Sequence, residues 1–239
     1  MAAGGATPMR LNVYGIAHTI QAKMPFVWGS VEKVNEWLFV LRYGSRLNTI
    51  ANEEQHGAYI YRRLNAGDVP ALVAFFGRQP EDSFRYFKPH QFDADTVSRL
   101  LRNKSYLAYG VMSGEKCVGY YFLRSYFIGK SYLGKLVDAD LRGRGIGKQM
   151  CMHLMDVATT LGLHMYETIS KENLSSLYAT QKVLETRVIK ELPDNYLYIE
   201  DIRKKPVGGG YKWLINSDLW TRYKHIESLG RRRGYSYAA

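Results

Sequence analysis

The sequence predicts an α/β protein in which one core domain carries an additional helical segment at each end. Strand-like and helix-like patterns alternate between residues 58 and 203, as expected for a sheet covered by helices. A separate helical pattern precedes this region, and another follows it after a glycine-rich linker at 204–210. We therefore divide the chain into an N-terminal extension (1–57), a core domain (58–203) and a C-terminal linker with a helix (204–239). An apolar content of 46% over 239 residues is sufficient for a packed core.

Each extension has its own helix signal. In the N-terminal extension, Val31, Val34, Leu38 and Leu41 recur at helical spacing, which predicts an amphipathic helix over residues 30–42. The polar stretch 48–55 is expected to be a linker. In the C-terminal extension, Ser217 is the candidate N-cap of a helix that ends at Gly230.

The first half of the core domain is expected to form a strand, two helices and a hairpin. Asp68 is the candidate N-cap of the first helix, and either Asp93 or Asp95 is that of the second. The hairpin pattern has its turn at 113–116. The predicted ranges are 59–64, 68–76, 93–101, 106–112 and 117–124.

The second half begins with a strand over 133–137, a glycine-rich turn and a long helix. Apolar residues in this helix are spaced four, four, three and four apart, at Ile146, Met150, Leu154, Val157 and Leu161. We expect the helix to stop at Gly162. A strand over 164–169, a helix over 174–184 and a closing hairpin over 187–192 and 196–200 follow.

Composition excludes several classes of protein. No apolar run approaches the ~18 residues that a membrane span requires, and residues 1–10 lack the pattern of a secretion signal. Cys117 and Cys151 make no disulfide framework, and no histidine has metal-ligand spacing, so no metal is expected. We expect a cytoplasmic protein with no membrane partner.

The formal net charge of +11 indicates an anionic partner. Nucleic acid, a phosphorylated cofactor and an anionic substrate all satisfy this condition, so charge alone selects none of them. Nucleic acid is the competing class, supported by the arginines and tyrosines of 230–237. Because that segment is short and terminal, we expect nucleic acid not to be the main partner.

The stretch 137–150 places Gly143, Gly145 and Gly147 between a predicted strand and a predicted helix. This arrangement presents backbone N–H groups and the positive end of a helix dipole to a phosphate. A P-loop fits poorly, because the glycine spacing is one residue short and Gln149 replaces the hydroxyl residue. A dinucleotide fingerprint also fits poorly, because Lys148 stands at its third glycine.

The hexapeptide 142–147 resembles the Arg/Gln-x-x-Gly-x-Gly/Ala pyrophosphate loop of the GNAT superfamily, the acyl-CoA-dependent N-acyltransferases. The element order over 58–203, about 60% of the chain, is also similar to that family's. The resemblance implies a mixed, mostly antiparallel central sheet flanked by helices, and acetyl-CoA or another acyl-CoA as co-substrate. It assigns CoA binding to Leu136, Val137, Asp138, Arg142, Gly143, Arg144, Gly145, Ile146, Gly147 and Lys148.

By this resemblance, the chain transfers an acetyl group to the amine of a small acceptor. The basic surface favours an amino sugar, a nucleotide-linked sugar or an amino acid as acceptor. A GNAT-like module that binds CoA or a protein partner with weak or no catalysis remains the alternative. The extensions are candidates for covering the acceptor cleft or for forming a homodimer contact.

Transfer to an amine requires a base, because the amine arrives protonated at neutral pH. Glu167 is the first candidate, since period two places it on one strand face with Met165 and Ile169. A carboxylate buried in an apolar row resists ionisation, as a base for an ammonium group requires. Asp138, at the end of the preceding strand, is the second candidate. The resemblance places the oxyanion donor among the backbone N–H groups of 136–138.

The acid that protonates the leaving thiolate is where the sequence departs from the family. The family pattern Asn-x-x-Ala/Ser-x-x-Leu-Tyr, anchored on Asn173 and Ser176, puts Thr180 where the tyrosine should be. Tyr178 lies two positions earlier, about 200° around the helix. Tyr178, Thr180 or water is therefore the candidate acid, and Asn173, Ser176 and Thr180 are candidate cofactor contacts. Arg124, at a strand end, is the candidate contact for an anionic acceptor group.

Overall fold

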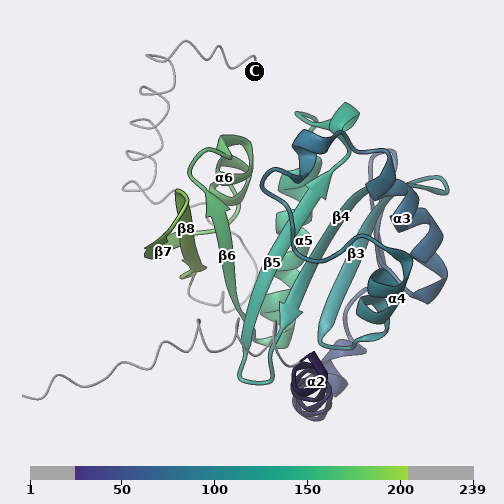
Figure 1. Cartoon of the computed structure of the whole chain (residues 1–239), viewed down its shortest axis with the longest axis vertical. Coiled ribbons are helices and arrows are strands. Elements are labelled where there is room, and N and C mark those ends of the chain that lie inside the picture. The colour runs from purple at the N-terminus through teal and green to yellow at the C-terminus, as the bar shows by residue number, and fades with distance from the viewer. Residues whose placement is uncertain (1–24, 204–239) are drawn as a thin grey trace, which may run out of the picture.

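The computed structural model describes residues 25–203, so the predicted helix after Ser217 and its linker lie outside the described residues. Eight strands form one sheet in the order β1-β2-β3-β4-β5-β6-β8-β7 (Figure 1). Every neighbouring pair is antiparallel except β5 and β6, which are parallel. The predicted fold class, a mixed and mostly antiparallel sheet flanked by helices, is confirmed.

The N-terminal extension packs on the core domain through a helix and a strand. Helix α2 (Pro25–Leu47) is longer than the predicted 30–42 and places Phe39 and Tyr43 in the hydrophobic core. Strand β1 (Glu53–His56) pairs with β2 (Tyr59–Arg63), so the prediction of a linker over 48–55 is wrong at its C-terminal end. The residues of β1 show no alternation of apolar and polar side chains, and this strand forms because its backbone pairs with β2.

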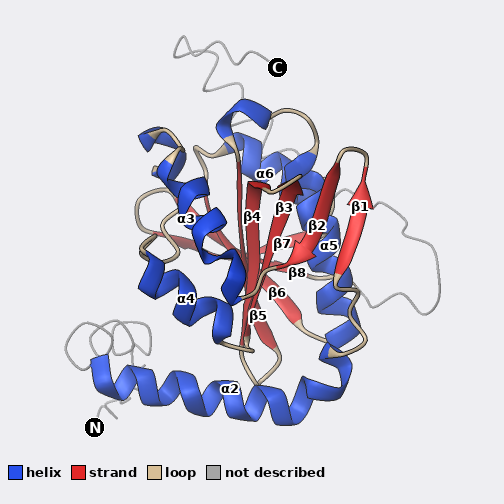
Figure 2. Ribbon diagram, turned by 90° about the vertical axis from the view of Figure 1, so that its right-hand side faces the viewer, coloured by secondary structure: helices blue, strands red, loops and turns tan. Residues whose placement is uncertain are grey.

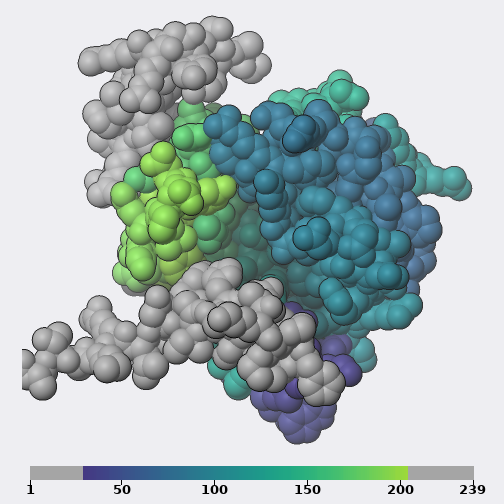
Figure 3. Space-filling model, in the orientation of Figure 1, coloured from purple at the N-terminus to yellow at the C-terminus, as the bar shows by residue number. Residues whose placement is uncertain are grey.

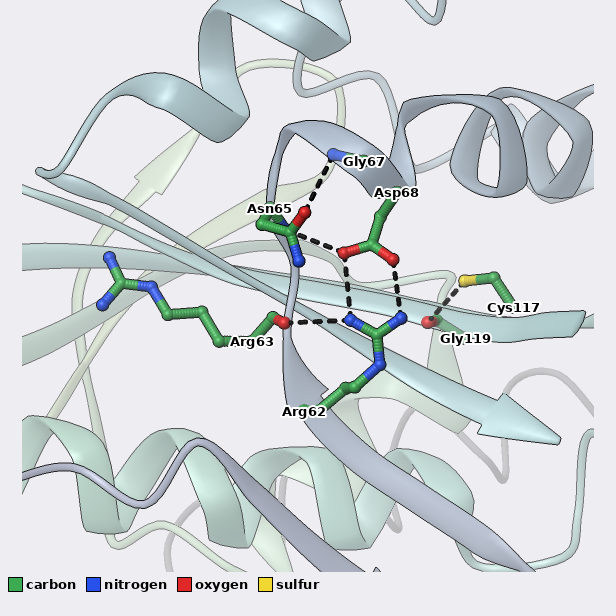
Figure 4. A network of polar contacts seen from close by, with 7 residues as sticks. All are labelled: Arg62, Arg63, Asn65, Gly67, Asp68, Cys117 and Gly119. Carbon is green, nitrogen blue, oxygen red and sulfur yellow. Dashed lines mark hydrogen bonds and ion pairs between the residues drawn. The ribbon is translucent and has the colours of Figure 1, made fainter. Parts of the chain in front are cut away.

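A polar network around Arg62 holds the turn after β2 (Figure 4). The Arg62 guanidinium donates to both carboxylate oxygens of Asp68, at 2.9 and 2.6 Å. Asp68 also accepts from the Asn65 N–H, and the Asn65 side chain accepts from the Gly67 N–H, which completes a capping box for the short turn η1 (Ala66–Asp68). Asp68 stands at the N-cap position of α3 (Val69–Gly77), but its side chain caps η1 instead.

The next elements form the centre of the sheet and one of its covers. Helix α4 (Ala94–Arg102) is capped by Asp93, whose Oδ1 accepts from the Thr96 N–H at 2.8 Å, which decides between the two predicted caps. Strands β3 (Tyr106–Ser113), β4 (Lys116–Ser125) and β5 (Lys130–Val137) follow. Most residues of β3 and β4 are buried, because helices lie on both faces of these strands (Figure 2).

The remaining elements complete the second face and the far edge of the sheet. Helix α5 (Ile146–Leu161) ends at Gly162, as predicted, with φ 75°. Helix α6 (Leu174–Gln181) is shorter than the predicted 174–184. Strand β6 (His164–Ser170) precedes α6, and the hairpin of β7 (Thr186–Leu192) and β8 (Tyr196–Asp201) turns through Asp194 and Asn195, both in the left-handed region.

The core is divided by the sheet. Met150 and Leu154 of α5 pack with Tyr109 on one face, whereas Phe75 of α3 packs with Tyr120 on the other. Helix α2 crosses one end of the sheet (Figure 2). No helix in the described part of the chain combines the length and apolar character needed to cross a membrane.

Candidate active site

The parallel strands β5 and β6 separate partway along their length (Figure 1). They pair only from Lys130 with His164 to Tyr132 with Tyr166. Farther along, β5 continues to pair with β4, and β6 pairs with β8, so their facing edges form a fork. This fork is the one place where the described sheet opens between two of its strands.

The open edge of β5 offers backbone donors to a ligand. The Asp138 N–H donates to the Val118 carbonyl at 2.9 Å and therefore points toward β4. Because the N–H direction alternates along a strand, the N–H groups of Lys135 and Val137 point the other way, into the fork. Of the three positions predicted to supply the oxyanion donor, Val137 is the one whose N–H faces the fork.

The glycine-rich loop follows directly after β5. Gly143 and Gly145 have φ angles of 77° and 81°, a left-handed conformation that side chains with a Cβ disfavour. No atom lies within 4 Å of where a Cβ would stand at either position, so backbone conformation, not crowding, requires glycine. Ile146 is buried and anchors the loop, while the side chains that surround it are exposed, at Arg142, Arg144 and Lys148.

The N-terminus of α5 completes this loop. Gln149 is the first residue whose N–H donates within the helix, to the Gly145 carbonyl at 3.1 Å. The N–H groups of Ile146 and Gly147 precede that bond and so have no acceptor within the helix. The peptide dipoles of this 16-residue helix add a partial positive charge at the same end. Loop and helix together suit a pyrophosphate.

Asp138 and Arg142 flank the short turn η3 (Ala139–Leu141) and are both tied to the α3–α4 connection. Asp138 accepts from Arg78 Nε at 3.0 Å and from the Asp140 N–H at 3.3 Å. Arg142 donates to Ser83 Oγ at 2.6 Å. Because both Asp138 oxygens are engaged, the arrangement favours a role in holding the loop over the predicted role as base.

Glu167 is part of a buried polar cluster with Lys135 and Thr180. Lys135 Nζ donates to Glu167 Oε1 at 3.0 Å and to Thr180 Oγ1 at 2.7 Å, and Thr180 donates to Glu167 Oε2 at 2.8 Å. The Lys135 and Glu167 side chains are only 5% and 8% exposed. Sequence patterns placed Glu167 on an apolar face correctly, but they did not reveal the lysine that neutralises it.

The cluster contains a charged lysine and a neutral thiol. Burial acts to lower the pKa of Lys135, but attraction by Cys151 in its ionised form and by the Glu167 carboxylate at 3.0 Å outweighs it, and the net pKa is raised. Burial raises the pKa of Cys151, although Lys135 opposes this. The Lys135 ammonium therefore stays protonated, and the Cys151 thiol is not ionised to a nucleophilic thiolate.

A cavity of about 1180 Å³ lies on the α3–α4 face of the sheet. Arg124, the predicted acceptor contact, lines it and donates to Glu32 of α2 at 2.8 Å. Gly29 of α2 also lines the cavity, so the N-terminal extension forms part of its wall. Most of the lining residues belong to the blue segment of the space-filling view, which lies above the purple α2 (Figure 3).

His90 also lines this cavity and is linked to two tyrosines. Its Nδ1 lies 2.7 Å from the Gln91 carbonyl, which can only accept, so Nδ1 carries the proton. Nε2 then accepts from the Tyr120 hydroxyl at 3.1 Å, and Tyr120 accepts from Tyr106 at 2.9 Å. Burial lowers the pKa of His90, which keeps its imidazole neutral at pH 7.

The hydrogen-bonded group of His90, Tyr120 and Tyr106 reaches the strand beside the fork. Tyr120 of β4 pairs directly with Leu136 of β5, at the predicted site of the thioester carbonyl. Sequence reasoning missed His90, because it tested the histidines only for metal-ligand spacing. Nothing in the sequence near His90 shows that the chain folds back to bring it to Tyr120, 30 residues away.

Residues 73–184 match the model of the acetyltransferase (GNAT) family. The chain therefore contains a domain of the GNAT superfamily. No curated protein sequence matches the chain significantly. The GNAT match covers the glycine-rich loop, the fork, His90 and α6 up to its C-terminus.

Solved GNAT structures share the fold at low sequence identity. The GNAT domain of S. lividans PAT is 15% identical, with a TM-score of 0.54, over 63% of this chain and 93% of that one. The putative acetyltransferase yncA from Salmonella typhimurium, solved with acetyl-CoA, is 15% identical, with a TM-score of 0.53, over 65% and 100%. Spermidine N-acetyltransferase from Vibrio cholerae, solved with CoA and spermine, is 14% identical, with a TM-score of 0.50, over 61% and 95%.

Helix α6 is where this GNAT chain departs from the family pattern. Asn173 caps the helix by accepting from the Ser176 N–H at 3.2 Å. Thr180, at the position of the GNAT tyrosine, is fully buried in the cluster with Glu167. Tyr178 is exposed on another side of α6, with the Lys182 ammonium 4.1 Å from its ring centroid. The helix is regular, so no bulge brings Tyr178 to the position of Thr180.

Proposed function

We propose that this chain transfers an acetyl group from acetyl-CoA to the amine of a small acceptor. The observation that supports this most is a fork of two strands with a phosphate-binding loop at its end and a large cavity on one face of the same sheet. Membership of the GNAT superfamily supplies the reaction type.

Backbone groups of the fork and loop fit acetyl-CoA. The N–H groups of Ile146 and Gly147 would hold the pyrophosphate, with Gly143 and Gly145 leaving the backbone accessible. The N–H groups facing the fork from Lys135 and Val137 would hold the pantetheine arm, and Val137 would polarise the thioester carbonyl. When bound, acetyl-CoA supplies an activated acetyl thioester. Arg144 and Lys148 add positive charge, and Asn173 and Ser176 would contact the cofactor from α6.

We assign the base to His90. Neutral imidazole is ready to accept a proton at pH 7, and the hydroxyls of Tyr120 and Tyr106 connect Nε2 to the cavity wall. A proton taken from the acceptor amine at Tyr106 can pass along these hydroxyls to His90. Glu167 and Asp138 are less suited, because each already binds a cation.

Thr180 is better placed than Tyr178 to protonate the departing thiolate. Its hydroxyl, which donates to Glu167 Oε2 in this structure, would turn toward the sulfur, and the Lys135 ammonium that donates to Thr180 could replace the proton that it gives. The same ammonium would stabilise the negative charge on sulfur. Because Thr180 is a poor acid compared with tyrosine, a catalytically weak CoA-binding module is the second candidate function.

The cavity lining favours an acceptor that carries an anionic group. Its wall carries four cations against three carboxylates, namely Arg85, Lys88, Arg99 and Arg124 against Glu32, Glu81 and Asp82. An amino sugar, a nucleotide-linked sugar or an amino acid combines the required amine with such a group or with neighbouring polar groups.

The test is release of free CoA from acetyl-CoA with a panel of amines. With an accepted amine, the substitution His90→Gln is expected to lower kcat about 10²–10⁴-fold, as for loss of a general base. His164→Gln is the matched control, because His164 is exposed on β6. If acetyl-CoA binds in a calorimeter but no amine releases CoA, the second candidate function is correct. If H90Q keeps full activity, the base is not His90.

A further inference from the structure

The outer side of α2 carries a row of uncovered apolar side chains. Val31, Val34, Trp37 and Leu41 are 51%, 57%, 66% and 73% exposed. Phe39 and Tyr43, on the opposite side of the helix, are 0% and 2% exposed. Helix α2 therefore has two apolar sides, and the described protein buries only one of them.

The tip of the β4–β5 hairpin adds to this surface. The Phe127 N–H donates to Asn35 Oδ1 at 3.1 Å, and Arg42 donates to the Phe127 carbonyl at 2.9 Å, so the tip lies against α2. Phe127 and Ile128 are 39% and 56% exposed. Both elements lie at the same end of the molecule (Figure 1). We call this surface the basal face; it consists of the six exposed residues Val31, Val34, Trp37, Leu41, Phe127 and Ile128.

The charged groups around the basal face are mostly cations. Lys33, Arg42, Arg46, Lys104 and Lys130 are exposed on α2 or beside it. The two carboxylates of α2 are engaged with the protein, since Glu32 accepts from Arg124 and Glu36 accepts from the Lys104 N–H at 2.8 Å. The surface that remains combines tryptophan and branched apolar side chains with a positive rim.

We propose that the basal face docks the protein onto the surface of an anionic lipid bilayer. A helix that lies flat, with its apolar side chains at the acyl boundary and its lysines and arginines among the headgroups, is a stable arrangement at such a surface. The rim cations contribute because anionic headgroups attract them within a Debye length.

A second copy of this chain fits the same face less well. Pairing two copies of α2 brings Lys33 and Arg42 of each helix near the same cations of the other. The carboxylates in the described part of α2 are already held by Arg124 and Lys104, so they are not placed to relieve that repulsion. An anionic surface removes the repulsion and still covers the apolar side chains.

This inference departs from the expectation of no membrane partner, which rested on the lack of a spanning segment. Docking at the interface needs only one exposed helix side. Gly29 and Glu32 of α2 also line the acceptor cavity, so docking would place the cavity close to the headgroups. The inference stands independently of the acetyl-transfer reaction.

The test is flotation of the full chain with vesicles of phosphatidylcholine, either alone or mixed with phosphatidylserine. We expect binding to the mixed vesicles that falls steeply with salt, and weak binding to phosphatidylcholine alone. The double substitution Val34→Glu and Leu41→Glu is expected to weaken binding at least about tenfold, because it places carboxylates where apolar contact is needed. Lys33→Glu alone should weaken binding roughly fivefold or more.

Ile189→Glu provides the matched control, because Ile189 is an exposed apolar residue on β7, away from the basal face. Thermal melting checks that each variant is folded. Equal binding to both vesicle types, or undiminished binding by V34E/L41E, would overturn the proposal. A lipid-free dimer that V34E/L41E dissociates, with no vesicle binding, would also overturn it and identify the face as a contact between copies.

Discussion

Replacing Glu167 by glutamine would leave the Lys135 ammonium without its counter-ion inside the protein. The two groups are 3.0 Å apart and almost fully buried, so the lost attraction cannot be replaced by solvent. Removing one partner of such a pair costs about 3–5 kcal/mol, out of a total stability of about 5–15 kcal/mol. For a protein of this size we expect Glu167→Gln to lower Tm by roughly 6–20 °C.

Replacing the whole cluster should behave differently. In the variant K135M/E167L/T180V, apolar side chains of similar volume fill the same space, and no buried polar group of the cluster is left without a partner. Such replacements of buried ion pairs are often neutral or stabilising by about 1–4 kcal/mol. The assay is urea unfolding followed by circular dichroism, with E167Q, K135M and the triple variant compared.

The activity of K135M/E167L separates the two roles considered for Glu167. If His90 is the base, the pH–rate profile of this variant should keep an acidic limb set by His90, although the loss of Lys135 lowers the rate. A folded K135M/E167L protein that binds acetyl-CoA and turns over without that acidic limb would return the role to Glu167. If E167Q had the same free energy of unfolding as the unsubstituted protein, the buried ion pair itself would be refuted.

Three further predictions follow from single positions. Gly145→Ala should strain the loop by about 1–2 kcal/mol and weaken the binding of acetyl-CoA. Gly162→Ala, at a residue of similar φ at the other end of α5, should cost similar stability and leave the calorimetric Kd for acetyl-CoA unchanged. Equal Kd values for the two variants would contradict the role of the loop. His153 is buried, with its Nδ1 2.6 Å from the Tyr121 hydroxyl, and burial lowers the pKa of its imidazole. Its contribution to the free energy of unfolding is therefore complete above about pH 6.5, the unfolded pKa, and is lost as the pH falls through the lower folded pKa. Urea unfolding from about pH 7 to pH 5 should show this loss, and His153→Gln should make the curve flatter; an unchanged slope would exclude His153 as a contributor. Asp68→Ala removes the capping box and the Arg62 contact and should lower stability by about 1–2 kcal/mol, compared with Asp95→Ala, an exposed first-turn residue of α4, in thermal melts.

Local patterns in the sequence determined most of the individual elements. The spacing of Ile146, Met150 and Leu154 fixed the buried side of α5, and Gly162 fixed its end, because both depend on helix geometry over a few residues. The glycines of the loop are also a local signal, since left-handed φ angles at Gly143 and Gly145 are a property of single residues. The mixed sheet, by contrast, was expected from the family resemblance.

Only the tertiary structure decided how the site is assembled. β1 forms because β2 offers it a partner, although its own residues show no strand pattern. The contacts of Lys135 with Glu167, of Arg78 with Asp138, of His90 with Tyr120 and of Arg124 with Glu32 join residues 30 to 92 positions apart. Such pairs leave no periodic trace in the sequence, because each depends on which strands become neighbours and where β5 and β6 separate. The glycine-rich loop was therefore visible in the sequence, whereas the partners of each acidic and basic group were not.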